Sequence, residues 1–191
     1  HATGFHGRVW DQAVRRLPAE RHVIAIEQRC HGRSDPVPFD NWRHFGHDQA
    51  AQIDALGLQG ALGVGHSMGA HALVQAASLR PGAFRRLILI DPVMSAPDAY
   101  QQPPVPLGQL HPAAQRKNQF DSPQAMFHRF ADRAPYAVFD RAALMDYCQH
   151  GLRPADSGSG WQLCCAPQHE GQVYPLARNF PSTYDLVHAL D

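Results

Sequence analysis

A serine flanked by two glycines is the residue pattern with the clearest chemical potential in this chain. Gly65-His66-Ser67-Met68-Gly69 fits G-x-S-x-G, and it lies between a run of small and β-branched residues and a helical pattern. At so sharp a strand-to-helix turn the serine hydroxyl is exposed at the carboxyl end of the sheet, and glycines avoid collision because they have no Cβ. The helix N-terminus offers free N–H groups to an oxyanion. This setting predicts a nucleophilic Ser67; the alternative is a glycine-rich turn capped by a serine.

The elements that position this serine follow from the hydrophobic pattern of the first half of the chain. Apolar, largely β-branched runs at 22–26, 60–65 and 86–90 predict buried strands. Residues 46–56 and 68–80 have the spacing of helices, and Pro81-Gly82 ends the second of them. Strands that alternate with helices predict an α/β fold with a parallel sheet and right-handed crossovers.

The pattern changes after Asp91-Pro92. Residues 93–115 are rich in proline, and the sequence beyond them carries helical patterns with N-cap residues at Ser122 and Asp140. Only one short run, 161–165, alternates like a strand. Further helices are expected from about 167 and from about 183. We therefore expect a mainly helical lobe after the α/β half.

Four segments of the chain resemble segments of the α/β-hydrolase family, and they occur in the same order as in that family. Besides the Ser67 turn, residues 1–7 (His-Ala-Thr-Gly-Phe-His-Gly) are similar to the family's oxyanion loop. Residues 29–35 are similar to its Arg-Gly-His-Gly-x-Ser-Asp loop, with Cys30 in place of the usual glycine, and we expect this loop to brace the oxyanion segment. Leu89-Ile90-Asp91-Pro92 resembles the strand end at which members insert a helical cap.

The resemblance implies three parts: a partial hydrolase core over 1–92, a helical cap over 93–182 and a return helix over 183–191. The chain begins at His1 and ends at Asp191, just after a predicted helix. We therefore expect a sheet truncated at both ends, as in an excerpt of a longer protein. We expect the cap to lie over the serine and to line an apolar pocket.

The resemblance also implies roles for individual residues. Ser67 is the expected nucleophile, and the backbone N–H groups of Thr3 and Met68 are the expected oxyanion donors. The catalytic acid and histidine are expected beyond the last residue. Asp91 is a minor candidate for the acid, because some members place the acid there, although Asp-Pro is also a common structural strand end. No histidine within the chain is assigned as the base, so the isolated chain is expected to be inactive.

The implied function is a serine hydrolase that cleaves a small, largely apolar ester or related acyl compound through an acyl-enzyme. A carbon–carbon bond hydrolase, which uses the same triad, and a non-catalytic ligand-binding protein on the same fold are the alternatives. Serine at the turn argues against the dehalogenase and epoxide-hydrolase branches, which have Asp there. No cofactor is implied.

The resemblance implies a small-molecule substrate as the partner, and the composition argues against two other kinds of partner. The 191 residues include 17 Lys and Arg and 17 Asp and Glu, so the net charge is zero and no basic run predicts a nucleic-acid partner. No apolar run reaches the roughly 20 residues that span a bilayer, so no membrane association is expected.

His44, His47 and Asp48 lie close in sequence but suit a solvated helix face, and no metal site is expected. Four cysteines without C-x-x-C spacing favour a cytoplasmic setting. The oligomeric state is not predicted.

Overall fold

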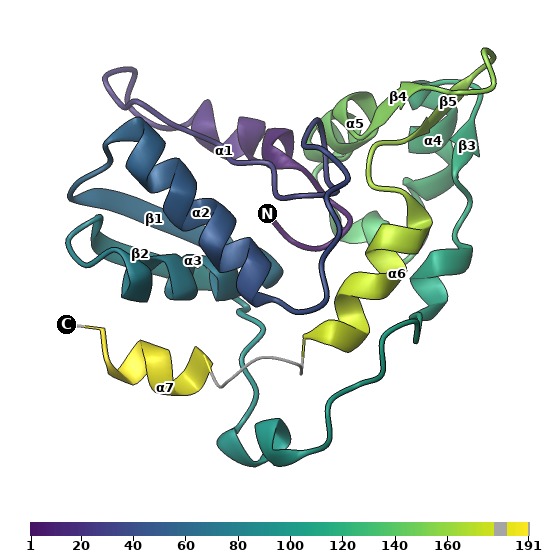
Figure 1. Cartoon of the computed structure of the whole chain (residues 1–191). Coiled ribbons are helices and arrows are strands. Elements are labelled where there is room, and N and C mark those ends of the chain that lie inside the picture. The colour runs from purple at the N-terminus through teal and green to yellow at the C-terminus, as the bar shows by residue number, and fades with distance from the viewer. Residues whose placement is uncertain (178–182, 191) are drawn as a thin grey trace.

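A computed structural model describes residues 1–177 and 183–190. Figure 1 shows two groups of elements: a parallel sheet with its helices, and a lobe built from the later part of the chain. The loop at the N-terminus lies between the two groups. Among the described residues, no helix combines the length and the apolar composition needed to cross a bilayer.

The sheet contains two parallel strands joined by a helix. Strands β1 (Ala61–His66) and β2 (Phe84–Ile90) pair with Val64 opposite Ile88, and α3 (Met68–Leu79) connects them. A second helix, α2 (Arg43–Leu56), packs on α3 and ends at Gly57, which has the left-handed φ of 60° common after helices. Two predicted strands and both predicted helices are therefore present, in an α/β hydrolase fold.

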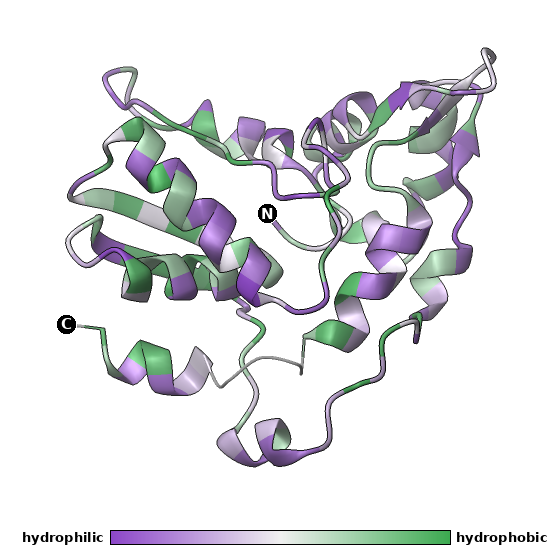
Figure 2. Cartoon of the chain, in the orientation of Figure 1, coloured by the Kyte–Doolittle hydropathy of each residue, from purple (hydrophilic) through white to green (hydrophobic). Residues whose placement is uncertain are grey.

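The two faces of this sheet differ in exposure. Leu62 and Val64 of β1 and Ile88 and Ile90 of β2 share one face, and their exposed fractions lie between 42% and 48%. The opposite face lies against α3, whose side chains are almost all buried. Figure 2 shows this apolar character along β1. Exposure alternates along both strands because successive side chains point to opposite faces and only one face is covered.

The prediction of a strand at 22–26 is wrong. These residues are not part of any strand, and Val23 and Ile24 are each 40% exposed. Their β-branched side chains favour an extended backbone, but a strand also requires a neighbour with which to form ladder hydrogen bonds. In the described part of the chain, β1 pairs with β2 and with no segment on its other side.

The lobe contains three helices of two turns or more: α4 (Pro123–Phe130), α5 (Arg141–His150) and α6 (Pro167–Leu176). The predicted N-caps are present, since Ser122 Oγ accepts from the Ala125 N–H at 3.0 Å and Asp140 accepts from two N–H groups at the start of α5. The shorter helical segments within residues 1–177 and 183–190 are η1 (Gly7–Trp10), α1 (Asp11–Val14), η2 (Pro97–Gln101), η3 (Pro112–Gln115), η4 (Tyr136–Val138) and α7 (Thr183–His188).

The lobe also contains a small antiparallel sheet that the sequence did not predict in full. Strands β3 (Gln119–Phe120), β4 (Leu152–Pro154) and β5 (Trp161–Leu163) are arranged in the order β3-β5-β4. Only β5 was expected. Two or three residues are too few to establish a period of two, which is why the flanking strands left no sequence signal.

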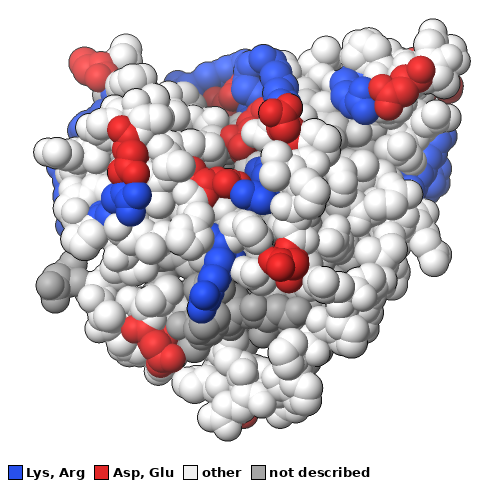
Figure 3. All heavy atoms as spheres, in the orientation of Figure 1, with Lys and Arg blue, Asp and Glu red and all other residues white. Residues whose placement is uncertain are grey.

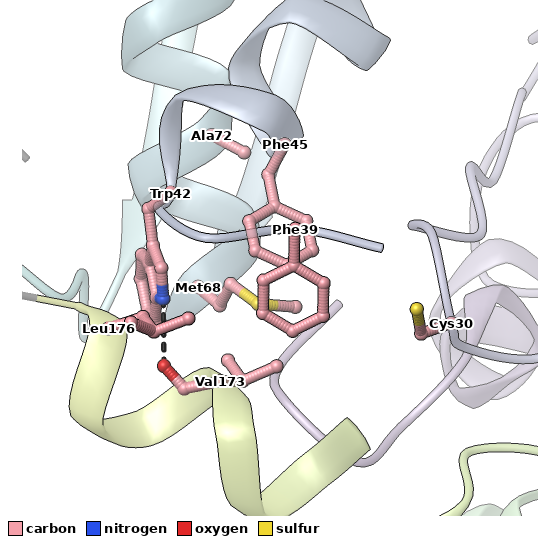
Figure 4. Packing of buried hydrophobic residues seen from close by; sticks show 8 residues of the cluster. All are labelled: Cys30, Phe39, Trp42, Phe45, Met68, Ala72, Val173 and Leu176. Atoms are coloured by element: carbon pink, nitrogen blue, oxygen red, sulfur yellow. Dashed lines mark hydrogen bonds between the residues drawn. The ribbon is translucent and has the colours of Figure 1, made fainter. Parts of the chain in front are cut away.

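Two clusters of buried side chains hold these elements together. Figure 4 shows the first, in which Trp42 and Met68 from the α/β half meet Val173 and Leu176 of α6. The Trp42 indole N–H donates to the Val173 carbonyl at 2.8 Å. The second cluster fills the lobe around Met126, Leu144 and Tyr147 and is joined by Phe5 from the N-terminal loop, among other side chains. The first cluster therefore links the lobe to the sheet half, and the second links the lobe to the N-terminal segment.

After the lobe the chain returns to the sheet half. Helix α7 packs on α3, where Thr183 Oγ1 lies 3.4 Å from Nδ1 of His71. Residues 178–182 of the expected lobe and Asp191 of the expected return helix lie outside the described residues. The division at 92 and 182 stays a prediction.

Candidate active site

Ser67 lies in a strained turn at the carboxyl end of β1. Its φ of 54° and ψ of −120° fall outside the helical and extended regions, and α3 begins at the next residue. The Ser67 N–H donates to the Ile90 carbonyl of the neighbouring strand at 3.0 Å, and the Ser67 carbonyl accepts from the N–H groups of Ala70 and His71. These hydrogen bonds hold the turn in the geometry expected of a nucleophile elbow.

The two glycines of the motif are needed because their α-carbons lie against other backbone atoms. A Cβ on Gly65 would lie 2.6 Å from Cα of Ala70, and one on Gly69 would lie 2.7 Å from the backbone N and O of His1. Gly65 therefore permits the sharp turn. Gly69 permits the N-terminal loop to approach the start of α3.

This close approach brings the side chains of Thr3 and Met68 into contact, the two residues whose backbone N–H groups are the predicted oxyanion donors. Thr3 Oγ1 lies 3.5 Å from the sulfur of Met68, the residue that follows Ser67. The loop is fixed on its other side by Gln28, whose N–H donates to Nε2 of His1 at 3.1 Å, and by the ring of His31, 5.3 Å from that of His1. The loop that contains His31 thus braces the N-terminal segment, as the sequence predicted.

Asp91 lies next to the serine turn. It follows β2 directly and has a φ of 42°, while Val93 two residues later donates its N–H to the Ser67 carbonyl at 3.4 Å. A non-glycine residue with positive φ is uncommon, and such strain concentrates at functional sites. Whether Asp91 is an acid or a structural strand end stays a prediction.

The histidines near Ser67 do not have the surroundings of a general base. His71 is fully buried, its Nδ1 donates to the Val93 carbonyl at 2.9 Å, and burial lowers its pKa to about 4. His66 is half-buried, and burial lowers its pKa, which the charge of Asp91 partly offsets. His111, His128, His150 and His169 lie in the lobe, and His188 lies on α7.

The described residues contain no group of three or more His, Cys, Asp and Glu that could hold a metal ion. His44 lies 2.9 Å from Asp40, and Asp48 accepts two hydrogen bonds of 2.6 Å from Arg29. The sequence cluster is thus divided between two separate ion pairs. Figure 3 shows acidic and basic side chains interspersed over one face of the molecule, as the zero net charge suggests.

The four cysteines are free thiols with little thiolate character: Cys30, Cys148, Cys164 and Cys165. Burial raises the pKa of Cys30 to about 11 and that of Cys148 to about 12. Cys30, which stands where the resemblance expects glycine, has the left-handed φ of 63° that glycine adopts readily. A thiol with a raised pKa is a poor nucleophile at neutral pH, which leaves Ser67 as the stronger candidate.

A hollow of about 450 Å³ opens in the lobe between η3, α4 and α6. It is lined by Ala113, Gln115, Arg116, Lys117, Arg129, Phe130, Tyr136 and Glu170. Four of these side chains are charged: Arg116, Lys117, Arg129 and Glu170. The apolar pocket expected over Ser67 stays a prediction. Sequence reasoning missed the polar residues of this hollow because Arg116 and Glu170, which pair at 2.7 Å, are 54 positions apart and belong to no motif.

A parallel sheet with a serine held in a strained turn between strand and helix defines the α/β-hydrolase class. The chain matches the Alpha/beta hydrolase family over residues 1–191 and belongs to it.

Its similarity to curated proteins covers a shorter segment. It is 36% identical over 93 residues to 2-(acetamidomethylene)succinate hydrolase of Mesorhizobium japonicum and 36% identical over 87 residues to a non-heme chloroperoxidase of Streptomyces lividans. These segments are 46% and 44% of this chain, but only 34% and 32% of the relatives. The match thus spans about a third of each relative.

Solved structures extend the likeness of fold to nearly the whole chain. The crystal structure of E-2-(acetamidomethylene)succinate hydrolase has a TM-score of 0.78 at 22% identity, covering 97% of this chain and 66% of that one. A thioesterase domain from the curacin biosynthetic pathway has a TM-score of 0.72 at 22% identity and covers 98% and 68% of the two chains. An esterase of Mycobacterium tuberculosis has a TM-score of 0.64, again at 22% identity, covering 97% and 60%.

Proposed function

We propose that this chain carries the nucleophile and the oxyanion donors of a serine hydrolase that cleaves a small ester or related acyl compound. The observation that carries the proposal is the backbone of Ser67, which has a strained φ of 54° at the carboxyl end of β1, directly before the N-terminus of α3. The names of three similar proteins, a hydrolase, a thioesterase and an esterase, agree with acyl transfer to water. The free thiols support a cytoplasmic setting.

The chemistry proceeds in two steps. Ser67 Oγ attacks the acyl carbon while its proton passes to a base, and the backbone N–H groups of Thr3 and Met68 hold the oxyanion that forms. The leaving group departs with a proton and leaves an ester on Ser67, which water then hydrolyses. Loss of one oxyanion donor typically costs about 3 kcal/mol of transition-state stabilisation, roughly a hundredfold in rate.

We propose that the acid, like the base, lies outside these residues, and that Asp91 is the minor candidate within them. Its strained backbone places it beside the serine turn, on the same edge of the sheet. The base is assigned to the portion of the natural protein that corresponds to the unmatched third of the solved hydrolase structure, since this chain covers 66% of it.

The proposal is tested by labelling and turnover together. A fluorophosphonate should label the natural full chain at Ser67, and p-nitrophenyl acetate should be hydrolysed, with both activities lost in Ser67→Ala. The matched control is Ser78→Ala. Ser78 lies on α3, the helix that follows Ser67, and its hydroxyl donates to the Gln75 carbonyl. Residues 1–191 alone should hydrolyse the ester poorly. Hydrolysis that survives Ser67→Ala would overturn the proposal, and equal Ser67-dependent rates from both chains would place the base within these residues.

A further inference from the structure

A buried ion pair in the lobe contacts the loop that carries Thr3. Arg116 Nη1 donates to Glu170 Oε2 at 2.7 Å, and the two side chains are only 17% and 7% exposed. Burying two charges is unfavourable unless further hydrogen bonds compensate. Here Arg116 Nη2 also donates to the hydroxyls of Tyr136 and Tyr147, each at 3.1 Å. The pair is therefore the centre of a polar network, not an isolated contact.

The far side of the Glu170 carboxylate lies against Gly4. A Cβ on Gly4 would lie 2.7 Å from Glu170 Oε1 and 2.8 Å from its Cδ, and Gly4 has a left-handed φ of 76°. Gly4 directly follows Thr3 in the sequence. The position of the carboxylate therefore limits where the backbone of this loop can lie.

The same network also holds the next two residues of the loop. The ring of Tyr147 lies 4.8 Å from that of Phe5 and is stacked 5.9 Å from that of His6. His6 Nε2 donates to the Tyr147 carbonyl at 3.0 Å. Arg116 thus joins the two lobe residues, Glu170 and Tyr147, that together contact three consecutive residues of the loop.

The loop is consequently held between two supports. On one side are the start of α3 and Met68, which Thr3 contacts. On the other side is the lobe, whose helix α6 packs Val173 on the same cluster as Met68, one turn after Glu170. The distance between the two proposed oxyanion donors therefore depends on the lobe as well as on the sheet.

We propose that Arg116 and Glu170 are positioning residues, which fix the oxyanion loop against the Ser67 turn without contacting the substrate. This inference rests on the proposed function. It predicts that the ion pair affects how well charge on an oxyanion is stabilised, and that it has little effect on how well the substrate binds. A merely structural pair would change the stability of the lobe and leave the chemistry of Ser67 unaltered.

The test uses the natural full chain with Glu170→Gln, Arg116→Met and the control Arg141→Met. Glu170→Gln keeps the volume that packs on Gly4 and removes the charge, so it folds more readily than a truncation would. Arg141→Met breaks an exposed pair with Asp132, 2.9 Å long, in the same lobe. The measurements are kcat and KM for p-nitrophenyl acetate, the rate of fluorophosphonate labelling and the midpoint of thermal unfolding.

Because a displacement of about 1 Å can cost two orders of magnitude in rate, we expect kcat to fall about 10- to 100-fold in both pair variants. KM should stay within about twofold, the labelling rate should fall in parallel with kcat, and Arg141→Met should change neither rate. A lower unfolding midpoint with unchanged kcat and labelling would overturn the inference, as would a rise in KM alone. If Ser67→Ala kept its activity, the proposed function itself would fail, which is a separate result.

Discussion

Two fully buried histidines make the stability of this protein sensitive to mild acid. His31 and His71 have no exposed surface, and burial lowers the pKa of each from 6.5 to about 4. In the unfolded chain both bind a proton near pH 6.5, whereas in the folded protein they resist protonation until about pH 4. Between these values the unfolded state binds more protons, so the free energy of unfolding falls as the pH falls.

The magnitude follows from the two pKa values. Each pH unit below 6.5 removes about 1.4 kcal/mol per histidine. At pH 5 the loss is therefore about 2 kcal/mol for each residue and about 4 kcal/mol for the pair. A typical domain has only about 5–15 kcal/mol of stability, so this loss is a large fraction of the total. Below about pH 4 both states are protonated and the loss from these two groups levels off.

The assay is urea unfolding at pH 8, 6.5 and 5, followed by tryptophan fluorescence. Trp42 is a suitable reporter, since its ring is buried and lies 4.8 Å from that of His71. His71→Gln replaces the titrating ring and should remove about half of the difference between pH 6.5 and pH 5. His44→Gln, at an exposed histidine that pairs with Asp40, should leave that difference unchanged. Equal stability at pH 6.5 and pH 5, or the same pH dependence in His71→Gln, would refute the reasoning.

Four further predictions each concern one substitution. Gly65→Ala should abolish fluorophosphonate labelling of Ser67, because the new Cβ would lie 2.6 Å from Cα of Ala70 and the turn must shift; labelling at the normal rate would contradict this. Met126→Ala should lower the free energy of unfolding by about 3 kcal/mol in urea titrations, since its side chain is fully buried. Val138→Ala, at 87% exposure, should change it by less than about 0.5 kcal/mol. Asp140→Ala should cost about 1 kcal/mol by the same measurement, because it removes two N-cap hydrogen bonds of α5; no loss would show that this cap is not needed.

The parts of the fold that the sequence predicted are those with strong local signals. The Ser67 turn was predictable because its two glycines and its flanking strand and helix all occur within about 20 residues. The helix starts at Ser122 and Asp140 were predictable because an N-cap side chain acts on N–H groups only two or three residues away. In each case the determining contacts lie close in sequence.

The parts that were missed depend on distant partners. Residues 22–26 have the composition of a strand, but pairing decides whether an extended segment is one, and composition does not show the partner. The link between Arg116 and Glu170 is a contact between two ordinary charged residues that only the folded chain brings together. The contact between Glu170 and Gly4 requires a glycine, and that glycine is visible in the sequence. Glycine occurs at many positions for other reasons, however, so its presence did not predict this contact.

The left-handed backbones of Cys30, Ser67 and Asp91 bear on how readily this protein tolerates further change. Each such conformation costs about 1–3 kcal/mol in a residue other than glycine, so together they consume a sizeable part of a typical reserve. Replacing Cys30 with glycine would relieve one of these costs, but it would also remove a buried thiol that belongs to the first cluster and donates to the Val37 carbonyl. The three strained residues therefore leave the chain less stability with which to accept destabilising substitutions in the lobe that alter substrate preference.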